Sequence, residues 1–125
     1  MYFCGFAGGT AVAVLTRARA GEVAASSAGE GFVAAALAET ARVTTAEGYP
    51  PPAEIIDLYR GFFRQIGSAG APSMLFDIEN GRPTEAEHIF GDLVRRADRL
   101  GVEAPILRAA LCNLQIYEAR RQRRG

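Results

Sequence analysis

The residues best suited to chemistry lie in one stretch of the chain, from Ser73 to Glu85. Both residues stand where a helix is expected to begin: Ser73 follows a proline-containing loop, and Glu85 follows Thr84, after the helix-ending Asn80-Gly81. Two helix N-termini, one with a hydroxyl and one with a carboxylate, would line a small polar pocket. Such a pocket suits an anionic substrate, because the hydroxyl and the helix dipoles bind its carboxylate while the glutamate orients an oxygen atom or a water molecule.

The same two residues also have a purely structural interpretation. Serine is a favoured N-cap residue, and an acidic residue in the first turn of a helix stabilises that helix through its dipole. Ser73 and Glu85 would then need no function. Local physics leaves both interpretations open.

Two further motifs are interpreted as structural. Gly29-x-Gly31-x-x-Ala34 matches a dinucleotide-binding pattern, but that pattern needs a preceding β-strand, and the residues before it are typical of a helix cap. The arginine-rich end, Arg120–Arg124, complements the dipole of the last helix and is expected to remain solvated. We therefore expect no nucleic-acid partner.

Two cysteines, one histidine and one asparagine are further candidates for a site. Cys4 and Cys112 lie far apart on apolar faces, so we expect two core cysteines, no disulfide or zinc site, and a reducing, cytoplasmic setting. His88 is the only histidine, which excludes a multi-histidine metal site and favours a structural role. Asn113 is either a hydrogen-bonding core residue or a solvent-facing one.

Apolar residues recur at helical spacing along the chain, and no segment alternates with the period of a strand. This pattern predicts an all-α fold, a compact bundle of about six helices in one domain. The helices are expected over residues 1–15, 27–46, 53–66, 73–79, 84–100 and 105 onward. Capping boxes, Ser27-x-x-Glu30 and Thr84-x-x-Glu87, would open two of them.

Burial of these helices can also be predicted. Helix 27–46 is apolar on nearly every side through Phe32–Ala38 and should be central. The helix at 53–66 should bury one stripe of side chains, formed by Ile55, Leu58, Tyr59, Phe62 and Ile66. In the helix at 84–100, Asp92 precedes Arg96 by four residues, the order that favours an ion pair.

The charge balance narrows the possible partners. The chain has 125 residues, with 14 Lys+Arg against 14 Asp+Glu, which argues against a surface built to bind nucleic acid or an anionic membrane. Every basic residue is arginine, so no lysine Schiff base can form. The apolar opening, Met1–Leu15, is too short to cross a bilayer and lacks a preceding basic residue, so we expect a buried first helix and no membrane partner.

The stretch from Ser73 reads Ser-Met-Leu-x-Asp-hydrophobic-Glu-x-Gly-Arg-x-Thr-Glu, and it is followed by Gly91 and by Leu-Gly-Val-x-x-Pro at 100–105. Upstream are Gly-Glu-Val at 21–23 and Glu-Gly-Tyr-Pro at 47–50. This pattern, which extends over nearly the whole chain, resembles the C-terminal domain of ketopantoate reductases (2-dehydropantoate 2-reductases). The resemblance implies the compact helical fold of the C-terminal domains of ketopantoate reductases and 6-phosphogluconate dehydrogenases.

The resemblance also implies a function. In that family an N-terminal Rossmann domain binds NADPH, the helical domain closes over a 2-oxo acid, and hydride passes to the ketone while a lysine acts as general acid. Ser73 matches the serine that binds the substrate carboxylate, and Glu85 matches the glutamate that positions the reacting hydroxyl and assists catalysis. The chain, residues 1–125, would be the substrate-binding, dimer-forming domain of an NADPH-dependent oxidoreductase. The whole enzyme would reduce ketopantoate, in pantothenate biosynthesis, or a related 2-oxo acid.

The chain departs from the family pattern in three ways. The family lysine belongs at or just before Met1, and the chain has no lysine. The Rossmann NADP-binding domain is absent from this chain, which by itself is therefore expected to be inactive. Gly70 stands where the family has an asparagine, three residues before Ser73, and the first helix has no asparagine. The substrate is then ketopantoate or another 2-oxo acid.

An alternative is a stand-alone, non-catalytic helical module for oligomerisation or protein contact. Apolar surface along Tyr2, Phe3 and Phe6 would favour such association. The substrate-binding hypothesis instead requires that Ser73 and Glu85 face one cleft, within about 10 Å of each other, since a helix as short as 73–79 is only that long.

Overall fold

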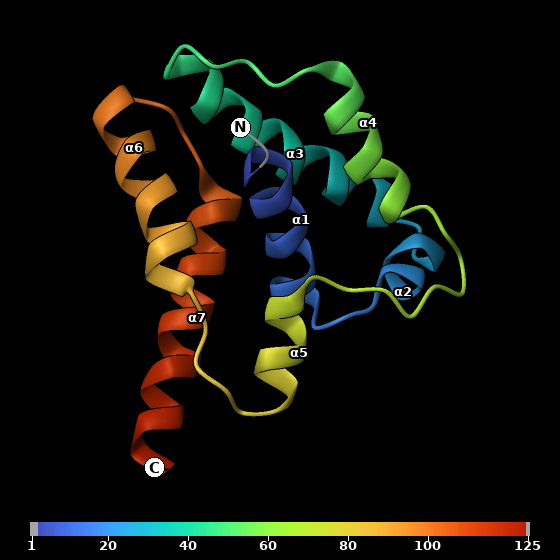
Figure 1. The fold of residues 1–125 in the computed structure, drawn as a ribbon, viewed down its shortest axis with the longest axis vertical. Helices are drawn as coiled ribbons and strands as arrows, with labels where there is room; N and C mark the ends of the chain where they lie inside the picture. The colour runs from blue at the N-terminus through green and yellow to red at the C-terminus, as the bar shows by residue number, and fades with distance from the viewer. Residues whose placement is uncertain (1–2, 125) are drawn as a thin grey trace.

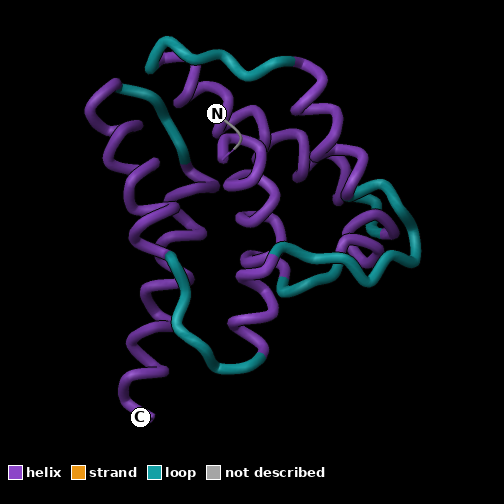
Figure 2. Tube along the Cα trace, viewed as in Figure 1, coloured by secondary structure: helices purple, strands orange, loops and turns teal. Residues whose placement is uncertain are grey.

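A computed structural model describes the backbone of residues 3–124 and the side chains of residues 6–123. This part of the chain forms seven α-helices and one π-helical turn, with no β-strand (Figures 1 and 2). The elements are α1 (Phe3–Thr16), α2 (Ala20–Ala25), α3 (Gly29–Ala46), α4 (Ala53–Phe62), α5 (Ser73–Glu79), the π-turn η1 (Glu87–Gly91), α6 (Asp92–Leu100) and α7 (Pro105–Arg124). The predicted all-α fold is confirmed, with one short helix, α2, more than expected.

Helix α1 is the centre of the fold, between α3 on one side and α7 on the other (Figure 1). Every residue from Ala7 to Val14 is buried, so the prediction of a buried first helix is confirmed for this segment. A Cβ atom on Gly8 would lie 3.0 Å from the side chain of Leu37, so glycine allows α1 and α3 to pack closely. None of the described helices has the length and apolar character needed to cross a membrane.

The prediction that the helix at 27–46 is central is confirmed in part, because α3 contacts α1, α2, α4, α6 and α7 but has one face exposed to solvent. Two alanines of its apolar run in α3, Ala35 and Ala38, are exposed. Small apolar residues on the solvent side of a helix cost little, so an all-apolar run does not require that every side of the helix be buried.

Two hydrophobic clusters flank α1 and divide the fold. One joins α1 to α5, η1, α6 and α7, and its largest buried members are Met74, Phe90, Leu93, Leu107 and Leu114. The other joins α1 to α2, α3 and the end of α4, and it includes Val12, Val23, Val33, Leu37 and Phe63. Packing on both faces of one helix therefore holds the bundle together.

A buried carboxylate joins α3 to α7. Glu39 is only 2% exposed. Its two carboxylate oxygens accept hydrogen bonds from the backbone N–H groups of Ile106, at 3.0 Å, and Leu107, at 2.9 Å. These donors belong to the first turn of α7, where N–H groups have no partner within the helix and the dipole favours a negative charge. Glu39 therefore caps α7 from another helix.

The helix missed by sequence analysis, α2, forms through distant contacts. The N–H of Ala20 donates to the carbonyl of Gly70 at 2.8 Å, and the N–H of Gly21 donates to the carbonyl of Ser68 at 2.9 Å. Glu22 adds a local bond by accepting the N–H of Arg19 at 2.8 Å. A Cβ on Gly21 would lie only 2.5 Å from the Ser68 nitrogen, so this approach requires glycine.

Two predictions about α3 and α4 are corrected. The capping box at Ser27 does not form: α3 begins at Gly29, and no side chain caps it. Helix α4 ends at Phe62, because Phe63 turns into the core and packs edge-on against the Phe62 ring, with centroids 5.0 Å apart. Ile66 thus lies outside the helix and is 79% exposed.

The predicted apolar stripe of α4 is therefore only partly buried. Leu58 is 67% exposed, whereas Ile56, Tyr59 and Phe62 pack against the second cluster. The face of α4 that contacts the core is narrower than the stripe, and it leaves Leu58 on the surface.

Removing the Glu39 carboxylate should destabilise the whole fold. We expect Glu39→Ala to lower the free energy of unfolding by about 3 kcal/mol, because the first turn of α7 loses its buried acceptor. Glu39→Gln, which keeps one carbonyl oxygen, should cost about half as much. The control Glu30→Ala, on the exposed face of α3, should change the free energy of unfolding by less than about 0.5 kcal/mol. Urea unfolding measures all three variants. Equal effects of Glu39→Ala and Glu30→Ala would contradict the role of the cap.

Candidate functional site

Ser73 is the first residue of α5, and its side chain is exposed. The N-cap position belongs to Pro72, with φ −61° and ψ 150°, and no side chain caps the helix, so the prediction of Ser73 as N-cap is wrong. Proline is well suited to a helix start, because its fixed φ fits and its missing N–H is not needed there. The Ser73 hydroxyl is consequently not used in capping α5.

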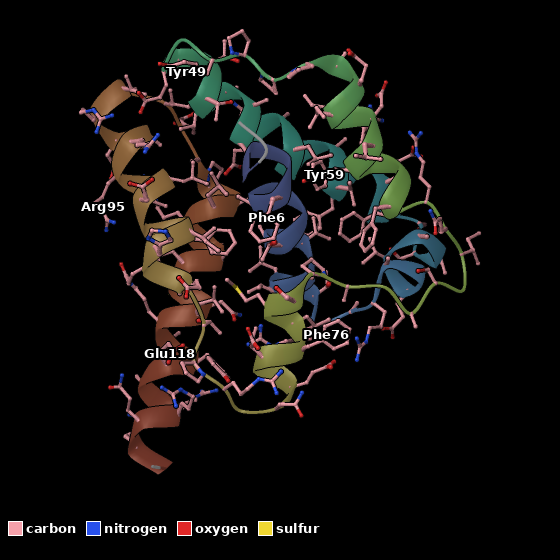
Figure 3. All side chains as sticks on the ribbon, viewed as in Figure 1. Phe6, Tyr49, Tyr59, Phe76, Arg95 and Glu118 are labelled. Atoms are coloured by element: carbon pink, nitrogen blue, oxygen red, sulfur yellow. The ribbon has the colours of Figure 1, made fainter. Side chains whose placement is uncertain are left out.

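Helix α5 is held in place from α2 and from its own end. Arg19 forms an ion pair with Glu79 at 2.6 Å, and its guanidinium lies over the Phe76 ring at 4.3 Å. Figure 3 shows Phe76 on α5, on the side toward α2. Gly81, with φ +67°, then turns the chain toward η1. Arg19 and the backbone bonds from α2 to residues 68 and 70 together position the segment that carries Ser73.

Glu85 is exposed and lies just before the helical backbone of η1 and α6 begins, rather than in the first helical turn. Its carbonyl accepts the N–H of Ile89 at 2.9 Å. The predicted capping box at Thr84 is wrong, because Thr84 donates both its N–H, at 2.7 Å, and its hydroxyl, at 2.8 Å, to Oε2 of Glu118. Thr84 therefore anchors the loop before Glu85 to α7.

The turn η1 has one residue more than an α-helical turn. A Cβ on Gly91 would lie 2.6 Å from Oε1 of Glu87, so glycine leaves room for that carboxylate. Glu87 also forms a 2.7 Å hydrogen bond with Gln115 of α7. The predicted ion pair between Asp92 and Arg96 forms just beyond, at 3.0 Å.

The anchor at Glu118 is electrostatic. Burial alone would raise the pKa of Glu118, but hydrogen bonds from the N–H and hydroxyl of Thr84, together with Arg121 at 3.0 Å, hold this pKa below its usual value of 4.5. Tyr117 adds a neighbouring contact by donating its hydroxyl to the carbonyl of Arg82 at 2.6 Å. Adjacent residues of α7 thus fix both ends of the 82–84 segment.

The structure brings the segments of Ser73 and Glu85 to one hydrophobic cluster. Met74 and Ala86, which follow them directly, are both buried in the cluster that joins α1, α5, η1 and α7. The two side chains themselves are exposed and share no hydrogen bond. The distance of about 10 Å inferred from the length of the short helix stays a prediction.

A cavity of about 640 Å³ lies beside Ser73. Its walls come from α1, from α4 and from Ala71 and Pro72, the two residues that precede Ser73. Phe6 of α1 and Tyr59 of α4, two of the lining residues, are labelled in Figure 3. The sequence pattern assigned Tyr59 to a core stripe, so this cavity was missed, and only the fold reveals it.

Gly70 helps to explain why the expected asparagine is missing. A Cβ at this position would lie 3.2 Å from two atoms of the Phe62 ring and from the Ser68 hydroxyl oxygen. This is tighter than usual contact, so a larger side chain would displace the ring. The Phe62 ring therefore takes the space that a side chain at position 70 would need.

The remaining candidates have no part in this site. Cys112 is exposed, so its assignment to the core is wrong, and Cys4 lies outside the residues with described side chains. His88 is exposed, as a surface histidine would be. Within the described chain, Oδ1 of Asn113 is buried and has no hydrogen-bond partner. No cluster of three metal-ligating side chains occurs in that part of the chain.

The glycine motif at the start of α3 does not form a dinucleotide cradle. It follows α2 and a turn, and a Cβ on Gly29 would lie 2.0 Å from the carbonyl oxygen of Val23. Gly29 is thus required for close packing of α2 on α3, whereas a Cβ on Gly31 would meet nothing within 4 Å.

Residues 3–118 match the family described as "Ketopantoate reductase PanE/ApbA C terminal". The chain belongs to this ketopantoate reductase C-terminal family. The resemblance seen in the sequence is thereby confirmed, and the matched region contains both Ser73 and Glu85.

Relatives of the family support the assignment. An uncharacterized oxidoreductase of Bacillus subtilis, YkpB, is 38% identical over 103 residues, which are 79% of this chain and 33% of that protein. The 2-dehydropantoate 2-reductase of Methylococcus capsulatus is 28% identical, with a TM-score of 0.79, over 96% of this chain and 42% of that one.

A third relative shares the fold. The dimeric ketopantoate reductase of Staphylococcus aureus, 22% identical, has a TM-score of 0.81 over 94% of this chain and 41% of that one. This chain therefore spans between a third and a half of the length of these three relatives.

Acid should release the loop before Glu85. Because the pKa of Glu118 is lowered in the folded state, its stabilising contribution is fully present above pH 4.5 and is lost as the pH falls through the folded-state pKa. We expect Glu118→Gln to lower the free energy of unfolding by about 1 kcal/mol at pH 7, with a smaller difference from the parent chain at pH 3. Urea unfolding between pH 3 and 7 measures this, with the exposed Glu103→Gln as control; a difference independent of pH would contradict the expectation.

Proposed function

We propose that this ketopantoate reductase C-terminal domain binds a 2-oxo acid for reduction, with Ser73 on the substrate carboxylate and Glu85 at the reacting oxygen. The observation that carries the proposal is the placement of the two family positions. Both side chains are exposed. The residue directly after each of them, Met74 and Ala86, is buried in the same hydrophobic cluster. Ser73 also directly follows Ala71 and Pro72, which line the cavity beside α1.

Each residue would have a distinct role. The Ser73 hydroxyl, which is not used in capping α5, would donate to the carboxylate of the acid, a hydrogen bond strengthened by the charge of its acceptor. The Glu85 carboxylate would accept the hydroxyl proton of the product and orient that oxygen. Substrates consistent with this arrangement are ketopantoate and related 2-oxo acids.

The cofactor would be held elsewhere. The dinucleotide-like motif Gly29-x-Gly31-x-x-Ala34 is occupied at Gly29 by the packing of α2 on α3, so this motif does not provide a cofactor-binding turn. We propose that NADPH binds to a separate N-terminal Rossmann domain, which would also carry the general-acid lysine. Homo-oligomerisation is proposed by analogy with the dimeric reductase of Staphylococcus aureus.

The size of the protein in its source cell tests the domain organisation. If this chain is part of a reductase, an antibody against it should detect a band larger than 13.3 kDa by about 100–150 residues. A band at 13.3 kDa would instead support the stand-alone interaction module. Immunoblotting after rapid lysis in denaturant measures the size before proteolysis intervenes.

Substitution of the two residues tests their roles. In the 125-residue chain, Ser73→Ala should weaken binding of a 2-oxo acid by about tenfold, because a charge-assisted hydrogen bond is lost. In the reductase that includes the N-terminal domain, Ser73→Ala should mainly raise KM, and Glu85→Gln should lower kcat by about 100-fold or more.

Matched controls are substitutions of exposed residues of the same types, Ser27→Ala and Glu54→Gln. These should leave the dissociation constant, KM and kcat unchanged. Binding is measured by isothermal titration and turnover by NADPH absorbance. Unchanged binding and turnover in both site variants, in chains with normal helical content, would refute the proposal.

A further inference from the structure

A second cavity lies at the other end of α5 from Ser73. Its walls come from the end of α5, from the C-terminal half of α7, which faces that end in Figure 1, and from the residue directly after α1. Its volume is about 660 Å³, the size of a small-molecule pocket. Three arginines, Arg17, Arg120 and Arg121, are among the lining residues, so one wall of the cavity is strongly positive.

The fold brings these arginines together from two helices. Tyr117, Arg120 and Arg121 are three and four residues apart, so they share one face of α7. Arg17 reaches this face from the end of α1. Burial and the charge of Glu118 raise the pKa of Tyr117, whereas the charges of Arg121 and Arg17 act to lower it. Both guanidinium groups therefore lie close to the Tyr117 ring.

Two of the positive charges in this cavity have no acidic partner. Arg121 forms an ion pair with Glu118 at 3.0 Å, and Glu79, the one acid of the lining, is bound at 2.6 Å by an arginine outside the cavity. Among the ion pairs of the described residues, none includes Arg17 or Arg120. The cavity thus offers two unbalanced cations to an anionic ligand.

Arg17 is held at the cavity in an unfavourable conformation. Its φ is +55°, and in the described part of the chain it is the only residue other than glycine with a positive φ. Glycine is the usual residue at such a position after a helix. The Arg17 Nη1 donates to the carbonyl of Val14 at 2.6 Å, which fixes the direction of the guanidinium. Burial lowers the pKa of Arg17, so this cation has lost part of its hydration, and an anion would compensate that loss.

The chemistry of the lining fits a phosphate group that carries an organic substituent. Guanidinium N–H groups bind phosphate oxygens through strong, often bidentate hydrogen bonds. A bare phosphate would leave most of the cavity unfilled, however, and Ile78 and the Tyr117 ring provide apolar surface beside the arginines. An organic group on the phosphate would gain by covering that surface.

We infer that this cavity is a binding site for a small organic phosphate, in which Arg17 and Arg120 bind the phosphate oxygens and Ile78 and Tyr117 contact the organic group. Sequence alone assigned the arginines at the end of α7 to a solvated helix end, and the fold adds Arg17 to two of them. This cavity shares no lining residue with the one beside α1. The inference therefore goes beyond the proposed function and does not rest on it.

The loop between α5 and η1 provides a local reporter of binding. Tyr117 donates its hydroxyl to the carbonyl of Arg82 at 2.6 Å. Arg121 pairs with Glu118, whose Oε2 accepts both hydrogen bonds from Thr84. A ligand that contacts Tyr117 and Arg121 should therefore shift the backbone NMR signals of Arg82 and Thr84.

Binding of three probes to the 125-residue chain tests the inference: phenyl phosphate, inorganic phosphate and phenol. Phenyl phosphate should bind at least about tenfold more tightly than either of the others, because it alone uses both the arginines and the apolar surface. Added salt should weaken its binding, since the contact with the arginines is electrostatic. Titration monitored by NMR gives the dissociation constants and locates the shifted signals.

Single substitutions test the two unbalanced arginines. Arg17→Gly and Arg120→Gln should each weaken phenyl phosphate by about tenfold, because each removes a charge-assisted hydrogen bond. Glycine adopts a positive φ without strain, so Arg17→Gly should leave the end of α1 folded. The matched control Arg42→Gln, at an exposed position of α3 outside the cavity, removes the same charge and should leave the affinity unchanged.

Three outcomes would overturn the inference. Phenyl phosphate that binds no more tightly than inorganic phosphate would mean that the arginines attract only counter-ions. Equal weakening by Arg42→Gln and Arg120→Gln would mean that net charge, rather than this cavity, governs binding. Binding of phenyl phosphate that leaves the signals of Arg82 and Thr84 unchanged, or no binding at all, would place no ligand in this cavity.

Discussion

The buried carboxylate of Glu39 is the interaction on which the arrangement of the site depends. It holds the first turn of α7 against α3 through two backbone N–H groups. Helix α7 in turn carries Tyr117 and Glu118, which bind the segment before Glu85 through the carbonyl of Arg82 and the N–H and hydroxyl of Thr84. A polar contact at one end of α7 therefore determines where Glu85 lies near the other end. Figure 3 shows Glu118 well along α7 from its start.

Ser73 is positioned by a different set of contacts. The backbone bonds from α2 to residues 68 and 70 and the ion pair of Arg19 with Glu79 hold the loop and α5 from one segment, residues 19–21. Neither Ser73 nor Glu85 contributes its own side chain to the core, so both remain free to contact a ligand. This division between residues that position and residues that would react is what a rigid binding site requires. It also agrees with membership of the ketopantoate reductase C-terminal family.

Sequence periodicity predicted the all-α fold and most helices, because apolar spacing of three and four residues reports directly on a buried face. Periodicity did not predict the features that depend on contacts between residues far apart in the sequence. Helix α2 depends on carbonyls of the 68–70 loop, the partner of Thr84 is Glu118 rather than its own helix, and Glu39 caps a helix far along the chain. Ser73 and Glu85 were found through a sequence resemblance, whereas the cavity beside Ser73 required the fold. Local spacing contains no information about which loop closes on which helix.

The π-turn η1 has a consequence for how the chain can vary in length. A turn with one extra residue is what a single-residue insertion leaves inside a helix, and Gly91 gives this one room beside Glu87. Deleting one residue between 87 and 91 would let the turn rewind as an ordinary α-helix. Because each residue turns a helix by about 100°, the residues directly before the turn, Glu85 and Ala86, would then rotate by about that angle relative to α6. The Glu85 side chain would then point in a different direction while every helix remained intact. The number of residues in this turn therefore sets the direction of the Glu85 carboxylate.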